Sequence, residues 1–187
     1  INFDLVMLGN LDPVIQMDIY SQVKNDHNFV ILDTMNYWIE KTQKELFEII
    51  CKVNLVVIND EEAQMLGKSD SIEECAKNIL SCGPDYIIIK KGSNGAELFS
   101  KHQRSEIPAL DNIKVVDPTG AGDSFVGGVC GYLALQSGIS FKEIHNAMIY
   151  GAVIASFCIE EFGLARLQKI SKKNIDKRIK TFAKHLL

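Results

Sequence analysis

Short, unbroken apolar runs separated by helical segments constrain the fold of this chain more than any other feature. The runs are Phe3–Leu8, Phe29–Leu32, Leu55–Ile58 and Tyr86–Ile89, and none of them alternates with polar residues. Strands of this kind are buried on both faces, which is typical of a parallel sheet with helices on both sides. The sequence therefore predicts an α/β fold built from right-handed βαβ units.

The segments between the runs carry helix-start signals. Asp12 and Pro13 form an N-cap and a first-turn proline, which predict a helix to about Lys24. Three further positions have the form of a capping box, namely Thr42 with Glu45, Ser71 with Glu74, and Ser140 with Glu143. Each of these pairs predicts the start of a helix.

The pattern changes after Lys90. Strand-like pieces at Ile87–Lys90 and Ala96–Ser100 flank a turn at 93–95, which predicts antiparallel edge strands. A further short strand is expected over Lys114–Val116. Helices are then predicted over residues 122–136, 141–157 and 174–186.

Composition limits the class of protein. With 187 residues, 47% of them hydrophobic and 24% charged, the chain suits one soluble globular domain over residues 1–187. No apolar run approaches the roughly 20 residues that cross a bilayer. A net charge of −4 argues against a nucleic-acid partner, and five cysteines without C-x-x-C spacing indicate reduced thiols in a cytoplasmic protein. We therefore expect no membrane and no nucleic-acid partner.

The C-terminal segment is locally basic. Between Arg166 and Lys184 there are eight basic residues and one acid, Asp176. Its apolar residues share one helical face, and they are Ile175, Ile179, Phe182 and Leu186. One interpretation is a helix that binds nucleic acid or a membrane surface. We favour the other, a terminal helix that packs its apolar stripe on the sheet and leaves a solvated basic face.

Polar residues follow the predicted strands. Ligands of open α/β sheets bind beyond the carboxyl ends of the strands. The residues at those positions are Asn10, Asp33, Asn59, Glu62, Lys90, Lys91, Gly92 and the run 117–123. Acids, amides, glycines and lysines thus recur at one edge, which predicts a polar ligand site there.

A glycine-rich turn between a strand-like segment and a long apolar helix is the most informative stretch. Gly120 and Gly122 allow positive φ angles and a close approach of the backbone to a ligand. The N–H groups of Ala121, Gly122 and Asp123 would form an anion hole at the helix N-terminus, and the Asp123 carboxylate beside it could accept a hydroxyl proton. The alternative is a tight helix N-terminus with an acidic cap.

The run Asp117–Gly128, DPTGAGDSFVGG, resembles the C-terminal signature of the ribokinase-like (PfkB) carbohydrate kinase family. Asn59–Glu62 is similar to its N-x-x-E motif, and Lys90–Ala96 is similar to its strand–turn segment beside the nucleotide. Val30–Asp33 resembles the acid-ending strand that precedes them. The resemblance extends from Phe3 to about Gly163.

The resemblance implies a ribokinase-like three-layer α/β/α fold, with a mostly parallel sheet and antiparallel edge strands. It also implies that the chain is the C-terminal portion of a longer kinase. Nothing in Ile1–Asn10 matches the glycine-pair substrate motif, the N-terminal core strand or the small β-sheet lid of the family. We therefore expect the chain as given to be inactive alone, and to self-associate as a homo-oligomer through the apolar surface left uncovered.

The resemblance assigns catalysis to the glycine-rich turn. Asp123 would be the base that takes a proton from the acceptor hydroxyl, and Gly120, Ala121 and Gly122 would form the anion hole. Asp117 is at a position that helps to hold a monovalent cation such as K⁺.

It assigns the nucleotide and metal to further positions. Glu62 would organise Mg²⁺ through water. Residues expected near the phosphates, the nucleotide cleft, the cation or the adenine are Asn59, Gly92, Asn94, Gly95, Thr119 and, less directly, Asn146. Lys90 stands where the family often has a small hydroxyl residue, and it either contacts phosphate or is a solvated edge residue.

The function implied by the resemblance is transfer of the γ-phosphoryl group of ATP to a hydroxymethyl group of a sugar or sugar-like acceptor. Two alternatives stay open. One is a nucleoside kinase of the same family, since the acceptor-binding motif is not found in the chain. The other is a nucleotide-binding module without catalysis.

Overall fold

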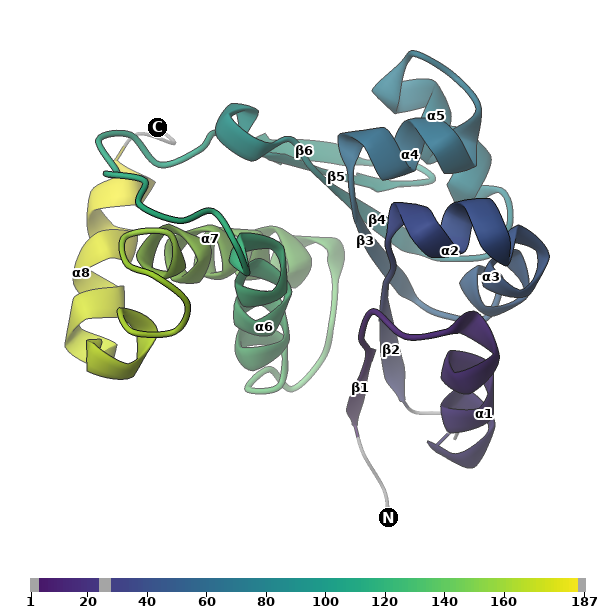
Figure 1. The fold of residues 1–187 in the computed structure, drawn as a ribbon, viewed down its shortest axis with the longest axis horizontal. Helices are drawn as coiled ribbons and strands as arrows, with labels where there is room; N and C mark the ends of the chain where they lie inside the picture. Colours follow the sequence, from purple (N-terminus) through teal and green to yellow (C-terminus); the bar gives the residue numbers. More distant parts are fainter. Residues whose placement is uncertain (1–3, 24–27, 185–187) are drawn as a thin grey trace. The chain divides into compact units, whose positions relative to one another are not determined.

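The structure is a computed structural model that describes residues 4–23 and 28–184 (Figure 1). Its strands are β1 (Leu5–Leu8), β2 (Phe29–Asp33), β3 (Leu55–Asn59), β4 (Tyr86–Lys90), β5 (Ala96–Ser100) and β6 (Arg104–Ile107). Its helices are α1 (Pro13–Val23), α2 (Asn36–Lys41), α3 (Gln43–Ile50), α4 (Asp60–Gly67), α5 (Ile72–Leu80), α6 (Ala121–Leu133), α7 (Phe141–Cys158) and α8 (Lys172–Ala183). Short 3₁₀ turns span Gly92–Asn94 and Leu167–Lys169. The predicted bounds Phe3, Lys24 and Leu186 lie outside the described residues.

The six strands form one sheet in the order of the chain. The first three pairs are parallel, with Leu5 opposite Phe29 and Leu55 opposite both Ile31 and Tyr86. The turns that lead into β5 and β6 are too short for a parallel crossover, so these strands run antiparallel to their neighbours. The prediction of a mostly parallel sheet with antiparallel edge strands is confirmed.

One local prediction is confirmed in part, and another is wrong. Helix α3 starts directly after Thr42, as predicted, but the Thr42 hydroxyl does not cap it. The unpredicted helix α2 ends at the same residue, and this hydroxyl donates to the carbonyl of Trp38 at 3.1 Å. Residues Lys114–Val116 do not form a strand. The N–H of Val116 instead donates to the carbonyl of Ile159 at the end of α7, at 2.8 Å, which ties this extended segment to a helix end.

The chain divides into two compact units. The N-terminal unit comprises Ile1–Lys91 and Glu97–Ser105, and the C-terminal unit comprises Gly92–Ala96 and Glu106–Leu187. None of the described helices is both long enough and apolar enough to cross a bilayer.

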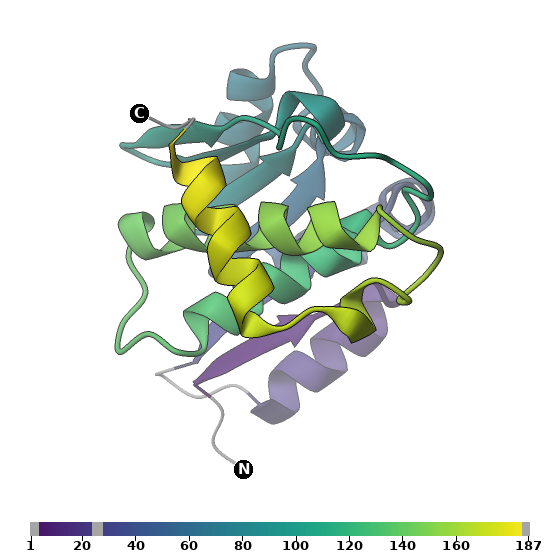
Figure 2. The same ribbon diagram turned by 90° about the vertical axis from the view of Figure 1, so that its left-hand side faces the viewer.

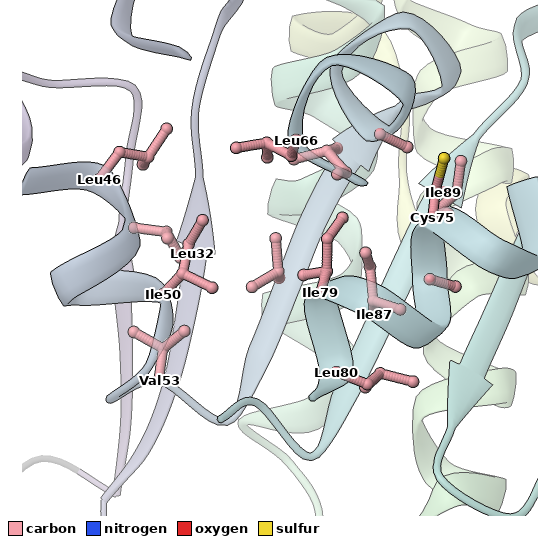
Figure 3. Packing of buried hydrophobic residues seen from close by; sticks show 14 of the residues in the cluster. Leu32, Leu46, Ile50, Val53, Leu66, Cys75, Ile79, Leu80, Ile87 and Ile89 are labelled. Atoms are coloured by element: carbon pink, nitrogen blue, oxygen red, sulfur yellow. The ribbon is translucent and has the colours of Figure 1, made fainter. Parts of the chain in front are cut away.

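The core of the N-terminal unit lies between the sheet and helices α3, α4 and α5 (Figure 3). Leu32 and Ile87 of the strands meet Ile50, Leu66 and Ile79 of the helices, and all five side chains are buried. Burying a side chain of this size stabilises the fold by about 1.5–3 kcal/mol. This core fixes the carboxyl ends of β2, β3 and β4.

In the C-terminal unit, α6 and α7 pack with almost nothing between their backbones. A Cβ atom on Gly128 would lie 2.8 Å from the Cα of Gly151, and one on Gly151 would lie 2.7 Å from the carbonyl oxygen of Phe125. Helix α8 packs across α7 (Figure 2). The prediction of a solvated basic face on this helix is wrong for Arg178. Its guanidinium packs on α7, 3.4 Å from the ring centre of Phe157.

Candidate active site

The residues predicted for the site fall into two groups, one in each compact unit. Asn59, Glu62 and Lys90 lie in the N-terminal unit, together with Asp33. The C-terminal unit carries the others, namely Gly92, Asn94, Gly95, Asp117, Thr119, Gly120, Ala121, Gly122, Asp123 and Asn146.

Asn59 and Glu62 form a reciprocal capping box at the junction of β3 and α4. The Oδ1 atom of Asn59 accepts from the N–H of Glu62 at 2.8 Å, and the Oε2 atom of Glu62 accepts from the N–H of Asn59 at 2.7 Å. Because this pairing draws the carboxylate down onto the helix end, Glu62 is only 6% exposed. The Glu62 side chain therefore lies at the predicted edge of the sheet but is largely shielded from solvent.

A second carboxylate and an ammonium group complete the charge pattern around Glu62. Burial raises the pKa of Glu62, and the repulsion of Asp33 adds to this, whereas the N–H of Asn59 and the charge of Lys90 oppose it. The Nζ atom of Lys90 lies 3.8 Å from Oδ1 of the buried Asp33. Lys90 therefore forms an ion pair with Asp33, and its charge also favours the ionised form of Glu62.

This charge pattern fits Mg²⁺ held through water. Among the described residues, no three or more His, Cys, Asp and Glu side chains are grouped to hold a metal ion by themselves. Mg²⁺ usually keeps several waters and takes one or two carboxylates together with substrate phosphates. Glu62 and Asp33 meet that requirement without a closed protein cage.

Gln16 lies at the same edge of the sheet as Asp33, and the sequence did not single it out. It is wholly buried on α1, and its Nε2 atom donates to the carbonyls of Gly9 at 2.7 Å and Asp33 at 3.0 Å. Its Oε1 atom and the Thr34 hydroxyl are buried and have no partner in the described parts of the chain. The available signal was a glutamine one turn into an otherwise apolar helix start. Gln16 thus joins the carboxyl ends of β1 and β2, next to unsatisfied polar atoms.

The glycine-rich turn starts α6 with a left-handed residue, Gly120, whose φ is 79°. The N–H of Ala121 donates to the carbonyl of Pro118 at 3.2 Å, so it is not free for a ligand as the sequence suggested. Within the described residues, the N–H groups of Gly122 and Asp123 find no protein acceptor. The side chain of Asp123 is exposed. Two available N–H groups and a carboxylate thus share one helix N-terminus, where the helix dipole favours an anion.

Asp117 holds the segment that leads into this turn. Its Oδ1 atom accepts from the N–H of Thr119 at 3.0 Å, and this N–H and the Thr119 hydroxyl lower the pKa of Asp117. The N–H groups of Val116 and Asp117 both donate to the carbonyl of Ile159, at 2.8 and 3.3 Å. The carboxylate of Asp117 therefore stays ionised and fixed against the end of α7.

The segment predicted for the nucleotide cleft is a tight turn. Gly92 and Gly95 have φ angles of 54° and 84°, and a Cβ atom on Gly95 would lie 2.0 Å from the carbonyl oxygen of Ile107. Only glycine fits at Gly95, so the turn is set by sterics. Asn94 closes the 3₁₀ turn, and Asn146 is half-buried in the second turn of α7.

Comparison with known proteins gives a family match. Residues 12–170 match the sequence profile of the pfkB family carbohydrate kinases. A nucleoside kinase from Methanocaldococcus jannaschii is 27% identical over 164 residues, which is 87% of this chain and 51% of that protein. A cytidine kinase from Thermococcus kodakarensis is 35% identical over 96 residues, covering 49% of this chain and 34% of the kinase.

Solved structures show the same fold. The crystal structure of the Methanocaldococcus jannaschii nucleoside kinase, an archaeal member of the ribokinase family, has a TM-score of 0.78 at 24% identity and covers 97% of this chain and 57% of its own. A Vibrio cholerae fructokinase has a TM-score of 0.80 at 17% identity, over 95% of this chain and 61% of its own. The chain spans about half the length of the nucleoside kinase that it matches.

Proposed function

Because this chain belongs to the pfkB family of carbohydrate kinases, we propose that residues 1–187 form the nucleotide-binding and catalytic domain of an ATP-dependent kinase. Its acceptor is the hydroxymethyl group of a sugar or sugar-like molecule. The observation that carries the proposal is the start of α6, where the exposed Asp123 carboxylate stands beside the available N–H groups of Gly122 and Asp123. Family membership and this local geometry support the same chemistry.

In the proposed reaction, the acceptor oxygen bonds to the γ-phosphorus of ATP while the bond from that phosphorus to the β–γ bridging oxygen breaks. The hydroxyl proton passes to the Asp123 carboxylate, and ADP leaves with the bridging electron pair. The N–H groups of Gly122 and Asp123 donate to the oxygens of the phosphoryl group in transfer. Positive φ at Gly120 lets the backbone approach that group closely.

Metal ions are assigned to two carboxylates. We propose that Glu62 organises Mg²⁺ through water, and that Asn59 and Lys90 lie on the phosphate side of the same cluster. Bound Mg²⁺ would neutralise phosphate charge. Structures of the Vibrio cholerae fructokinase contain ADP with calcium or with potassium. We assign a monovalent cation to Asp117 and Thr119, because the pKa of Asp117 is lowered and its carboxylate stays ionised.

The acceptor has two candidates. The family description and the fructokinases among the relatives favour a sugar. The match to the Methanocaldococcus jannaschii nucleoside kinase, which spans 87% of this chain, favours a nucleoside. Both acceptors present a hydroxymethyl group to the same base, so the assignment of Asp123 is independent of the choice.

The environment and assembly of the chain are proposed on separate grounds. We propose a cytoplasmic enzyme, since its five cysteines are free thiols. We also propose a homo-oligomer, because α1 and the residues before it expose apolar side chains at Leu11, Val14 and Ile15. Sedimentation of the chain tests this, and a monomer at micromolar concentration would contradict it.

The decisive test of the kinase is Asp123→Asn in the protein expressed from the whole reading frame that encodes these residues. The amide keeps the shape but cannot take the proton, so we expect turnover to fall by about 10²–10⁴-fold while ATP binding survives. A panel of sugars and nucleosides identifies the acceptor. Near-normal turnover would remove Asp123 from its role, and ATP binding by the unaltered protein without transfer to any acceptor would identify a non-catalytic module.

The 187-residue chain itself has a different expected result. With ATP, Mg²⁺ and the same panel, we expect weak ATP binding and no measurable phosphorylation. Robust turnover would show that the acceptor site lies within these residues after all.

A further inference from the structure

One cavity lies wholly within the C-terminal unit, and none of the residues assigned above lines it. It has a volume of about 600 Å³ and is lined by the segment 108–113, by Phe157 near the end of α7, and by one face of α8. Its lining combines two phenylalanine rings, Phe157 and Phe182, with three cationic side chains, Arg166, Lys177 and Arg178. One carboxylate, Asp111, is part of the lining, and its side chain is exposed.

The two arginines share a single carboxylate. Glu160 accepts from Nε of Arg166 at 2.9 Å and from a terminal nitrogen of Arg178 at 2.7 Å. Arg178 also donates to the hydroxyl of Ser156 at 3.0 Å, and its guanidinium lies 3.4 Å from the ring centre of Phe157. These contacts hold both guanidinium groups in place at the cavity wall and leave one of the two positive charges without a counter-charge.

Donors remain for a ligand. Within the described residues, the terminal nitrogens of Arg166 make no hydrogen bond, and Lys177 has no ion-pair partner. The excess positive charge therefore lies beside aromatic and aliphatic surface, at the wall formed by α7 and α8. A fixed guanidinium binds an oxyanion through paired N–H donors. Most of the accessible apolar surface comes from Pro108, Leu110 and Ile113, because Phe157 and Phe182 are largely buried.

We propose that this cavity binds a small organic phosphomonoester, with its phosphate against Arg166 and Lys177 and its carbon skeleton against Phe182 and the segment 108–113. A doubly charged phosphate suits the surplus of cations better than a neutral ligand does. Glu160 directly follows Ile159, whose carbonyl accepts hydrogen bonds from the N–H groups of Val116 and Asp117. The cavity therefore adjoins the helix end that fixes the segment before the glycine-rich turn.

Phenyl phosphate is a suitable probe, because it joins a dianion to an apolar ring, and benzyl alcohol is its neutral counterpart. Titration into the 187-residue chain, followed by amide chemical shifts, should shift resonances of Thr181, Phe182 and residues 108–113. Lys177→Gln should weaken binding by about tenfold, the loss of one charge-assisted hydrogen bond. Lys180→Gln removes an exposed lysine of the same helix that does not line the cavity, and should bind as the unaltered chain does.

Three results would overturn the proposal. Equal affinities of Lys177→Gln and Lys180→Gln would show that general charge attraction drives binding. Benzyl alcohol binding as tightly as phenyl phosphate would show an apolar cavity only. Shifts confined to Gly122 and Asp123 would place the phosphate at the start of α6. Arg166→Gln gives a second test of the site if its fold, checked by the same spectra, is retained.

Discussion

Asn59 and Glu62 each bind the backbone N–H of the other, so the Glu62 carboxylate has one oxygen committed to the end of β3 and one remaining. The committed oxygen fixes the side chain, and burial raises its pKa. Glu62 caps a helix and is also a candidate for organising Mg²⁺. Its effect on the stability of the fold and its effect on Mg²⁺ dependence can be measured separately.

The first prediction concerns pH and stability. Because the folded-state pKa of Glu62 is raised, its contribution to stability is fully present below its unfolded pKa of about 4.3, and is lost as pH rises through the folded value. Glu62→Gln removes this dependence, so the destabilisation it causes should be largest in acid and should shrink toward neutral pH. Urea unfolding across this range measures it. Glu61→Gln, at the exposed neighbouring position, should show no such trend. The same trend in both variants would contradict the assignment.

The second prediction concerns magnesium. If Glu62 organises the ion, Glu62→Gln should raise the Mg²⁺ concentration needed for half-maximal ATP binding by about tenfold, the equivalent of one charged contact. Glu61→Gln carries the same charge change on the exposed face of α4 and should leave the Mg²⁺ titration unchanged. Identical titrations for the two variants and the unaltered chain would sink the metal role of Glu62.

The third prediction concerns Asp117, whose pKa is lowered by the N–H and the hydroxyl of Thr119. The stabilisation that its charged form provides is present above the unfolded pKa of about 3.9 and is lost as pH falls through the folded value. Thr119→Ala removes the hydroxyl but keeps the N–H, so the midpoint for Asp117 should move part of the way up. Carbon NMR of the carboxyl group follows this titration. An unmoved midpoint would mean that the hydroxyl makes no contribution.

The fourth prediction concerns the α6–α7 contact. Gly151→Ala places a methyl group 2.7 Å from the carbonyl oxygen of Phe125, so the helices must separate, and we expect a loss of about 1–3 kcal/mol in the free energy of unfolding. Gly127→Ala is the matched control on α6, because a Cβ atom there meets nothing within 4 Å. It should stabilise by about 0.5–1 kcal/mol. Equal changes in the free energy of unfolding for the two substitutions would show that α6 and α7 have room for a methyl group at Gly151.

The sequence was sufficient to predict the elements whose structure depends on residues close together in the chain. The apolar runs that became β2, β3 and β4 are buried on both faces, and no other arrangement hides them. The turn from Gly120 to Asp123 was recognisable for a related reason, since its glycines and its acid are neighbours along the chain. The buried parallel strands and the start of α6 therefore followed from short stretches of sequence.

The errors lie where a hydroxyl, an N–H or a carboxylate finds a partner that the local residue spacing does not indicate. Val115 and Val116 read as strand, but both are exposed, and the N–H of Val116 finds its acceptor at Ile159, far along the chain. Thr42 has a capping-box spacing, yet its hydroxyl donates backward to Trp38, because a second helix ends at the same residue. The pKa of Glu62 likewise responds to the charges of Asp33 and Lys90, which lie on other strands. The spacing of residues along the sequence does not show which groups become their partners in the fold.

The contact between Gly128 and Gly151 fixes the spacing of two helices that both carry candidate site residues. Helix α6 meets α7 backbone to backbone at this point, so a side chain added at either glycine has no room. Asp123 lies on α6 and Asn146 lies on α7. A substitution at Gly128 or Gly151, outside the glycine-rich turn, would therefore displace Asp123 relative to Asn146.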